Sequence, residues 1–278
     1  MRLKQILRTV KSEWQRIQAM TLPPVSRYKQ RFVFIAGLPK AGTTWMENLV
    51  ETIPHYRRLA PFDPRASLDN HVLDRSLLQK LPGRGNYFLK THVEAYPEGV
   101  AALIEYQVPT LVMVRDLRDQ CVSRFYHVLN QPEHRHHDFY IHEDHEVAFK
   151  HCIEVSITEY AAWIRGWLNV IETRNMLFKM IRFEDMRSNT GLVFREVLEH
   201  FSINLDDETI EEIIQKVALA SRKSRSLKQG IKSGTNTFRS GKIGEWREHF
   251  SSASIEYFKS QANDVLVDCG YETSENWS

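Results

Sequence analysis

Three features are scarce in this chain of 278 residues, and each scarcity excludes a class of protein. No apolar run approaches the length of a membrane-spanning helix, and Met1 to Met20 lack the apolar block of a signal peptide. The three cysteines are widely spaced and odd in number, which argues against a disulfide framework and favours a reducing compartment. The net charge of +2 is too small to indicate a nucleic-acid partner. We therefore expect a cytoplasmic protein that binds no nucleic acid.

The order of apolar and polar segments predicts one α/β domain. No repeat, low-complexity tract or linker divides the chain, and its length suffices for one substantial core. Strand patterns alternate with helical patterns, which is typical of a parallel sheet with crossover helices. We expect strands at 32–36, 87–89, 110–114 and 176–181, helices at 97–105, 118–129, 146–173 and 194–201, and irregular structure at 54–85. The single domain would span 25–278, with its parallel sheet flanked by helices.

Residues 1–24 are predicted to form an amphipathic helical extension ahead of that domain. Apolar residues between Leu3 and Ile17 fall on one helical face, and lysines and arginines occupy the rest. Such a face can pack on its own domain. A basic amphipathic helix can also bind a membrane surface or a carrier protein through residues 1–20. The sequence leaves both alternatives open.

The most informative stretch runs from the strand at 32–36 through a turn broken by Gly37 and Pro39 into a helix near Trp45. A strand, a tight turn and a helix N-terminus present free backbone N–H groups and the positive end of a helix dipole. Lys40 adds a full positive charge inside the turn. The stretch therefore predicts a phosphate-binding loop.

This loop differs from the common P-loop. Gly37 and Gly42 have the P-loop separation, but Thr43 stands where the usual lysine follows the second glycine. The order Leu-Pro-Lys-Ala-Gly-Thr-Thr-Trp instead resembles the 5′-phosphosulfate loop of sulfotransferases that use 3′-phosphoadenosine 5′-phosphosulfate (PAPS). The resemblance implies that the donor is bound by Lys40, Ala41, Gly42, Thr43, Thr44 and Trp45.

A second motif follows the strand at 110–114. Arg115 ends this strand, and its planar guanidinium can bind phosphate through two parallel hydrogen bonds. Ser123 comes eight residues later, and the pair resembles the 3′-phosphate motif of the same family. Asp119, between them, is expected to complement the N-terminus of the helix at 118–129.

Residues 238–246 form a third motif, which resembles the family loop that closes over the 3′-phosphate. It would contribute Phe238, Arg239, Ser240 and Gly241. Ser240 replaces the lysine of the family pattern, and Lys242 is a candidate substitute for the missing charge.

Two further residues are assigned to the adenine side of the donor by resemblance. Phe183 stands in place of a tyrosine near adenine, which keeps stacking but loses the hydroxyl. The resemblance also places Ser221 near the adenine base.

The candidate base is His92, in Lys90-Thr91-His92 directly after a predicted strand. Imidazole titrates near neutral pH and can accept the proton of an attacking hydroxyl. The family pattern Lys-Thr-His has the same order. The resemblance implies that Lys40 and Lys90 neutralise charge on the bridging oxygen as the sulfuryl group leaves, and that Ser123 restrains Lys40. Because the lysines supply this charge, no metal is expected.

Three motifs in family order over residues 32–250 resemble a PAPS-dependent sulfotransferase of the cytosolic type. That resemblance implies in-line sulfuryl transfer from PAPS to an acceptor hydroxyl, with 3′-phosphoadenosine 5′-phosphate (PAP) as product. The alternatives are a P-loop small-molecule kinase, which would need a lysine after Gly42, and a non-catalytic nucleotide-binding module.

The identity of the acceptor is left open. Its hydroxyl could belong to a small molecule, a glycan, a lipid or a carrier-bound group, in a pocket built from 54–86 and 132–148. Five histidines between His134 and His145 belong to an acceptor-side loop or, less simply, to a zinc site.

Overall fold

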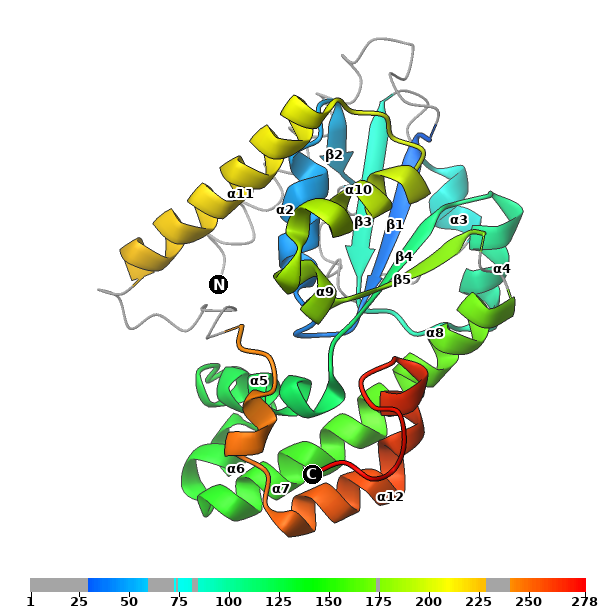
Figure 1. The fold of residues 1–278 in the computed structure, drawn as a ribbon. Helices are drawn as coiled ribbons and strands as arrows, with labels where there is room; N and C mark the ends of the chain where they lie inside the picture. The colour runs from blue at the N-terminus through cyan, green and yellow to red at the C-terminus, as the bar shows by residue number, and fades with distance from the viewer. Residues whose placement is uncertain (1–29, 60–72, 74, 82–84, 174–175, 229–240) are drawn as a thin grey trace.

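The computed structural model of the chain describes residues 30–59, 73, 75–81, 85–173, 176–228 and 241–278, and its side chains in 222–228 are not described. The predicted extension at 1–24 lies outside these residues. The fold consists of a sheet with helices on both faces and a further layer of helices beneath it (Figure 1). No helix in the described part of the chain is both long and apolar enough to cross a membrane.

Five parallel strands form the sheet, in the order β2-β3-β1-β4-β5. The strands are β1 (Phe32–Gly37), β2 (Tyr56–Arg58), β3 (Asn86–Thr91), β4 (Thr110–Val114) and β5 (Phe178–Arg182). The three central strands are buried at every position, as expected for a parallel sheet covered on both faces. The predicted α/β architecture is confirmed.

Alternate side chains of the strands enter two separate cores. Val33 and Ile35 of β1 pack in the core beneath four helices: α2 (Thr43–Thr52), α9 (Phe183–Ser188), α10 (Thr190–His200) and α11 (Asp207–Lys228). Phe34 and Ala36 point to the other core. Its helices are α3 (Arg75–Gln79), α4 (Pro97–Glu105), α5 (Leu117–Leu129), α6 (His137–His142), α7 (His145–Ser156), α8 (Ala162–Thr173) and α12 (Ser252–Asp268), with the π-helix η2 (Ile157–Ala161) and the 3-10 helix η3 (Glu245–Glu248).

Two segments expected to be irregular contain regular structure. Residues 54–85 include the edge strand β2 and the helix α3, and 132–145 include α6. β2 escaped prediction because its three residues include Arg57 and Arg58, so it shows no apolar run. The helix predicted at 146–173 is confirmed, although a π-turn interrupts it between α7 and α8.

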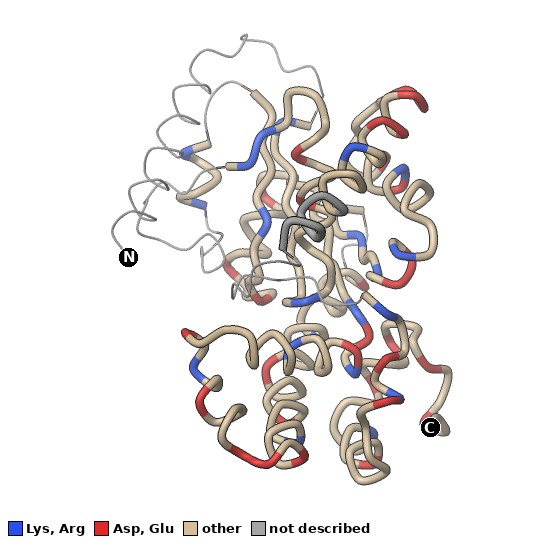
Figure 2. Tube along the Cα trace, turned by 90° about the vertical axis from the view of Figure 1, so that its left-hand side faces the viewer, with Lys and Arg blue, Asp and Glu red and all other residues tan. Residues whose placement is uncertain are grey.

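The helices α5, α6, α7 and α12 form the lower layer, beyond the carboxyl ends of the strands (Figure 1). Figure 2 shows lysines and arginines interspersed with acidic residues in both the sheet and this layer. In the described part of the chain, neither layer carries charges of one sign alone. The space between the carboxyl ends of the strands and the lower layer is where an open parallel sheet binds ligands.

Candidate functional site

The phosphate loop predicted after β1 has the geometry of an anion site. Lys40 and Gly42 both adopt left-handed backbone conformations, with φ of 70° and 74°. Gly42 is the N-cap of α2, and no side chain caps this helix end. The N–H groups of the first turn of α2, at Thr43 and Thr44, are of the kind that a helix leaves unpaired, and they are available to an anion.

Close packing explains both glycines of this loop. A Cβ atom on Gly37 would lie 2.0 Å from Cγ2 of Thr43, and one on Gly42 would lie 2.6 Å from Cδ2 of Phe183. The loop is closed by the Ala41 amide, which donates to the Leu38 carbonyl at 3.1 Å. A side chain at Gly37 would displace Thr43 in the first turn of α2, and a side chain at Gly42 would displace the Phe183 ring.

His92 lies beside this loop with a defined tautomer. Its Nδ1 is 2.5 Å from the Gly37 carbonyl oxygen. A carbonyl oxygen only accepts hydrogen bonds, so Nδ1 carries a proton and donates it, and Nε2 is the ring nitrogen that can act as an acceptor. Nε2 is 3.4 Å from Nζ of Lys90, a buried lysine at the end of β3. The ring therefore has the form required of a general base.

Tryptophans from α8 hold the backbone at His92. The Trp163 indole N–H contacts the carbonyl oxygens of His92 at 3.1 Å and Val93 at 2.8 Å. Trp167, one turn further along α8, donates to Val93 at 3.1 Å. Both tryptophans therefore anchor the segment after β3, a role that the sequence did not reveal.

Arg115 joins the phosphate loop to the C-terminal loop, which we define as residues 241–246. Its Nη1 donates to the Lys40 carbonyl at 3.4 Å, and its Nη2 donates to the Lys242 carbonyl at 3.0 Å. The side chain is buried, its guanidinium lies 4.6 Å from the centre of the Phe183 ring, and its Nε has no hydrogen-bond partner. A buried N–H donor without a partner is costly, and a phosphate oxygen would satisfy it. The arginine therefore fits a phosphate group.

Helix α5 brings Ser123 to the same region. Its first turn is tied to the phosphate loop by Gln120, whose Nε2 donates to the Pro39 carbonyl at 3.3 Å. Ser123 follows Gln120 by three residues and therefore lies on the same helical face, where it is half-buried. Gln120 thus places this face of α5 next to the phosphate loop.

His127, one turn beyond Ser123, was missed by the sequence analysis. Burial and the nearby Lys40 charge lower its pKa to about 4, and its Nδ1 is buried without a hydrogen-bond partner. It is therefore a neutral imidazole near the phosphate-loop lysine at physiological pH. Its spacing of four from Ser123 on a predicted helix is the signal that would have found it.

Asp119 lies near the N-terminus of α5, as predicted, and it also binds a distant part of the chain. The N-cap of α5 is Asp116, whose carboxylate accepts from the Arg118 amide at 2.9 Å. Asp119 lies in the first turn, but its carboxylate accepts hydrogen bonds from the C-terminal loop, 2.7 Å from the Gly244 amide and 2.9 Å from the Trp246 amide.

The remaining predicted donor residues differ in how the structure places them. Gly241 begins the described part of the C-terminal loop with φ of 63°, whereas Phe238, Arg239 and Ser240 lie outside the described residues. The Phe183 ring is buried against Gly42 and Arg115.

The two outlying predicted donor residues lie on helices α2 and α11. Trp45 is half-buried against the core beneath α2 and α11. Ser221 lies one turn beyond Val217, which packs α11 into this core. Among the described residues, no hydrogen bond joins Ser221 to the phosphate loop.

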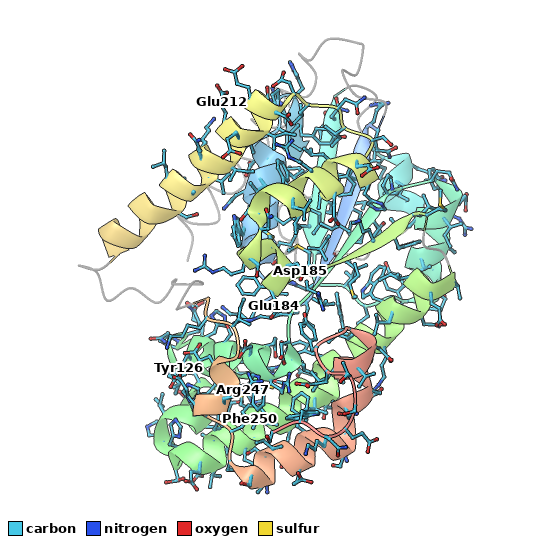
Figure 3. All side chains as sticks on the ribbon, in the orientation of Figure 1. Tyr126, Glu184, Asp185, Glu212, Arg247 and Phe250 are labelled. Atoms are coloured by element: carbon cyan, nitrogen blue, oxygen red, sulfur yellow. The ribbon has the colours of Figure 1, made fainter. Side chains whose placement is uncertain are left out.

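Glu184, next to Phe183, links the sheet to the C-terminal segment. Its carboxylate accepts from the Asp116 amide at 3.2 Å and from the Tyr271 hydroxyl at 2.9 Å. Burial raises the pKa of Glu184, opposed by these hydrogen bonds. Figure 3 shows Glu184 at the end of α9 that faces the layer containing Arg247 and Phe250.

The histidine-rich segment gives no support to a zinc site. Within the part of the chain that the structure describes, the close group of three candidate metal ligands is Glu245, Glu248 and His249, and it includes none of the histidines between 134 and 145. The His136 amide instead donates to Nδ1 of His134 at 3.2 Å.

Comparison with known proteins identifies the family. The Sulfotransferase domain family matches residues 30–270. The chain belongs to this family. It is a PAPS-dependent sulfotransferase, as its three motifs predicted, and the kinase alternative is excluded. The family acts on acceptors that carry a hydroxyl group.

Relatives are distant in sequence and close in fold. Sulfotransferase 1A1 of Rattus norvegicus is 22% identical, with 86% of each chain covered, and Sulfotransferase 6B1 of Danio rerio is 25% identical, with 80% and 73% covered. The crystal structure of mouse sulfotransferase SULT7A1 complexed with PAP has a TM-score of 0.64 at 17% identity, covering 84% of this chain and 83% of that one. Retinol dehydratase, in complex with androsterone and the inactive cofactor PAP, has a TM-score of 0.61 at 18% identity, with 89% and 82% covered. At these identities the structural likeness shows the fold.

Proposed function

We propose that His92 is the general base of this sulfotransferase. The observation that carries the proposal is the hydrogen bond from Nδ1 of His92 to the Gly37 carbonyl, because it places the ring proton on Nδ1 and makes Nε2 the basic nitrogen of the ring. Lys90, 3.4 Å from Nε2, would stabilise negative charge that develops nearby. Lys40 would do the same from within the phosphate loop. Transfer would be in line, without a covalent enzyme intermediate.

The donor site we propose consists of two phosphate subsites. PAPS supplies an activated sulfuryl group on its 5′-phosphate, which residues 40–45 would hold through the N-terminus of α2 and Lys40. Arg115 would bind the 3′-phosphate, because its buried Nε lacks a partner, and Ser123 would add a hydroxyl donor. Phe183, Ser221 and residues 238–241 would complete the nucleotide side.

The acceptor hydroxyl would approach between His92 and α5. His127, on α5 and near the Lys40 charge, would add a neutral imidazole on this side. We propose that the reacting hydroxyl, on a small molecule, a glycan, a lipid or a carrier-bound group, lies on this side, and that the enzyme works in the cytoplasm. The domain would span 25–278, and residues 1–20 would provide any contact with a membrane or carrier.

The test is calorimetric titration with PAP in the absence of magnesium, beside ADP and ATP with magnesium. We expect PAP to bind tightly and ADP much more weakly, and Arg115→Ala to weaken PAP by 10-fold or more, since hydrogen bonds to charged groups contribute about 1.5–3 kcal/mol. Arg165→Ala is the matched control, because Arg165 forms an ion pair with Asp264 on the surface. Equal affinities for PAP and ADP would contradict the proposed 3′-phosphate subsite.

A further inference from the structure

Asp119 is a buried carboxylate that the chemistry above does not use. It is 1% exposed, and both of its oxygens accept backbone N–H groups of the C-terminal loop. Gly244 and Trp246, which donate these bonds, are more than 120 residues away along the chain. Burial raises the pKa of Asp119, while the Trp246 amide opposes that shift. The carboxylate therefore binds the loop at two points.

The same loop holds Arg115, the proposed 3′-phosphate ligand. The Lys242 carbonyl, two residues before Gly244, accepts from Nη2 of Arg115 at 3.0 Å. Asp119 itself lies 3.9 Å from Nη2, one helical turn after Arg115. The position of the Arg115 guanidinium thus depends on the Lys242 carbonyl. The position of that carbonyl is set in turn by the two hydrogen bonds that the Gly244 and Trp246 amides donate to Asp119.

The side chain of Trp246 also packs against Arg118. Its ring lies 4.2 Å from the guanidinium of Arg118, which in turn contacts the Trp277 ring at 4.5 Å. Arg118 is fixed by ion pairs with Asp116 at 2.7 Å and Glu272 at 2.6 Å. This packing holds the Trp246 side chain, but the hydrogen bonds that fix the loop backbone near Arg115 come from Asp119.

We propose that Asp119 is a positioning residue that makes the enzyme selective for nucleotides with a 3′-phosphate. By holding the C-terminal loop at Gly244 and Trp246, it keeps the Lys242 carbonyl on Arg115 and the arginine fork aimed at that phosphate. The proposal rests on the proposed function, in which Arg115 binds the 3′-phosphate. The 5′-phosphate subsite, built from the N-terminus of α2, does not depend on Asp119.

The test compares PAP with AMP, which lacks the 3′-phosphate, in calorimetric titrations of the wild type and of Asp119→Asn. An asparagine keeps the size of the side chain but offers one acceptor oxygen, and its NH₂ group would face a backbone N–H. We expect PAP affinity to fall about tenfold and AMP affinity to change less than twofold. Asp264→Asn, which breaks the surface ion pair with Arg165, is the matched control and should change neither.

A double-mutant cycle separates positioning from a general loss of structure. If Asp119 acts through Arg115, Asp119→Asn should cost no further PAP affinity in an Arg115→Ala background, whereas a merely structural effect would add. If the asparagine variant does not fold, Asp119→Glu is used instead, because it keeps the charge and displaces the loop. The ratio of PAP affinity to AMP affinity is then measured for that variant.

The two proposals fail in different ways. A wild type that does not prefer PAP to AMP overturns the proposed 3′-phosphate subsite. A wild type that prefers PAP, together with an Asp119 variant that keeps the full preference, overturns the role of Asp119 alone.

Discussion

The two loops that meet at Arg115 are built in different ways. The phosphate loop at 37–45 is shaped by its near neighbours: the Gly37–Thr43 contact, the turn from Leu38 to Ala41 and the N-cap at Gly42. The C-terminal loop is held by two residues more than 120 positions away, Arg115 after β4 and Asp119 on α5. The phosphate loop also accepts hydrogen bonds from Arg115 and Gln120, but its turn is formed by residues that are close in sequence. The hydrogen bonds between the C-terminal loop and Asp119 can form only when the two ends of the domain have come together.

The largest expected effect tests the base that the phosphate loop positions. His92→Gln should lower kcat by about 10²- to 10⁴-fold, because glutamine can still donate to the Gly37 carbonyl but cannot accept the proton. PAP affinity should not change. Single-turnover transfer from radiolabelled PAPS to a set of phenol, sterol and sugar hydroxyls measures this, with His142→Gln on the exposed surface as control. A fall of less than threefold would rule out His92 as the base.

The next prediction concerns a substitution that would distort the phosphate loop through a steric clash. Gly37→Ala should destabilise the fold by about 1–3 kcal/mol and weaken PAP binding, because the new Cβ would overlap Cγ2 of Thr43. Thr43→Ser removes that methyl group and keeps the hydroxyl, so the double variant should recover most of the loss. Urea unfolding and PAP titration provide both measurements. An equally unstable double variant would show that the clash is not the cause.

A pH experiment examines α5, the helix that connects the two loops. The folded-state pKa of His127, about 4, lies below its unfolded value near 6.5. The unfolded chain therefore binds a proton at His127 more readily, and the free energy of unfolding decreases as pH falls from 6.5 towards 4. His127→Gln should therefore reduce the stability lost between pH 7.5 and pH 5 by about 1–2 kcal/mol. Urea unfolding of both proteins at the two pH values tests this, since other buried histidines contribute equally to each. Identical losses would mean that His127 titrates normally in the fold.

The smallest effect is expected at Lys242 in the C-terminal loop. Its carbonyl binds Arg115, whereas its ammonium lies 3.7 Å from Glu248 with both side chains more than 60% exposed. Exposed ion pairs contribute little, so Lys242→Ala should change PAP affinity less than twofold. A tenfold loss by titration would instead show that Lys242 supplies the charge missing at Ser240.

Sequence patterns predicted those parts of the structure that are formed by residues close together in the chain. β4 and α4 lie at the predicted residues, and the predicted strand, turn and helix around Gly37–Trp45 are present. β2 was not found, because a three-residue edge strand with two arginines has no apolar period. Asp119 was assigned to its own helix, since a sequence gives no sign that a first-turn aspartate will bind amides from the other end of the domain.

The packing of Arg118 has a consequence for how the protein acquires its activity during synthesis. Arg118 pairs with Glu272, 154 residues later, and lies against Trp277 as well as Trp246. Contacts of such long sequence separation form late, because closing a long segment costs chain entropy before any contact repays it. A nascent chain would thus have its phosphate loop translated well before the residues that pack with Arg118 against the C-terminal loop. We expect the chain to become competent only after Glu272 and Trp277 have left the ribosome.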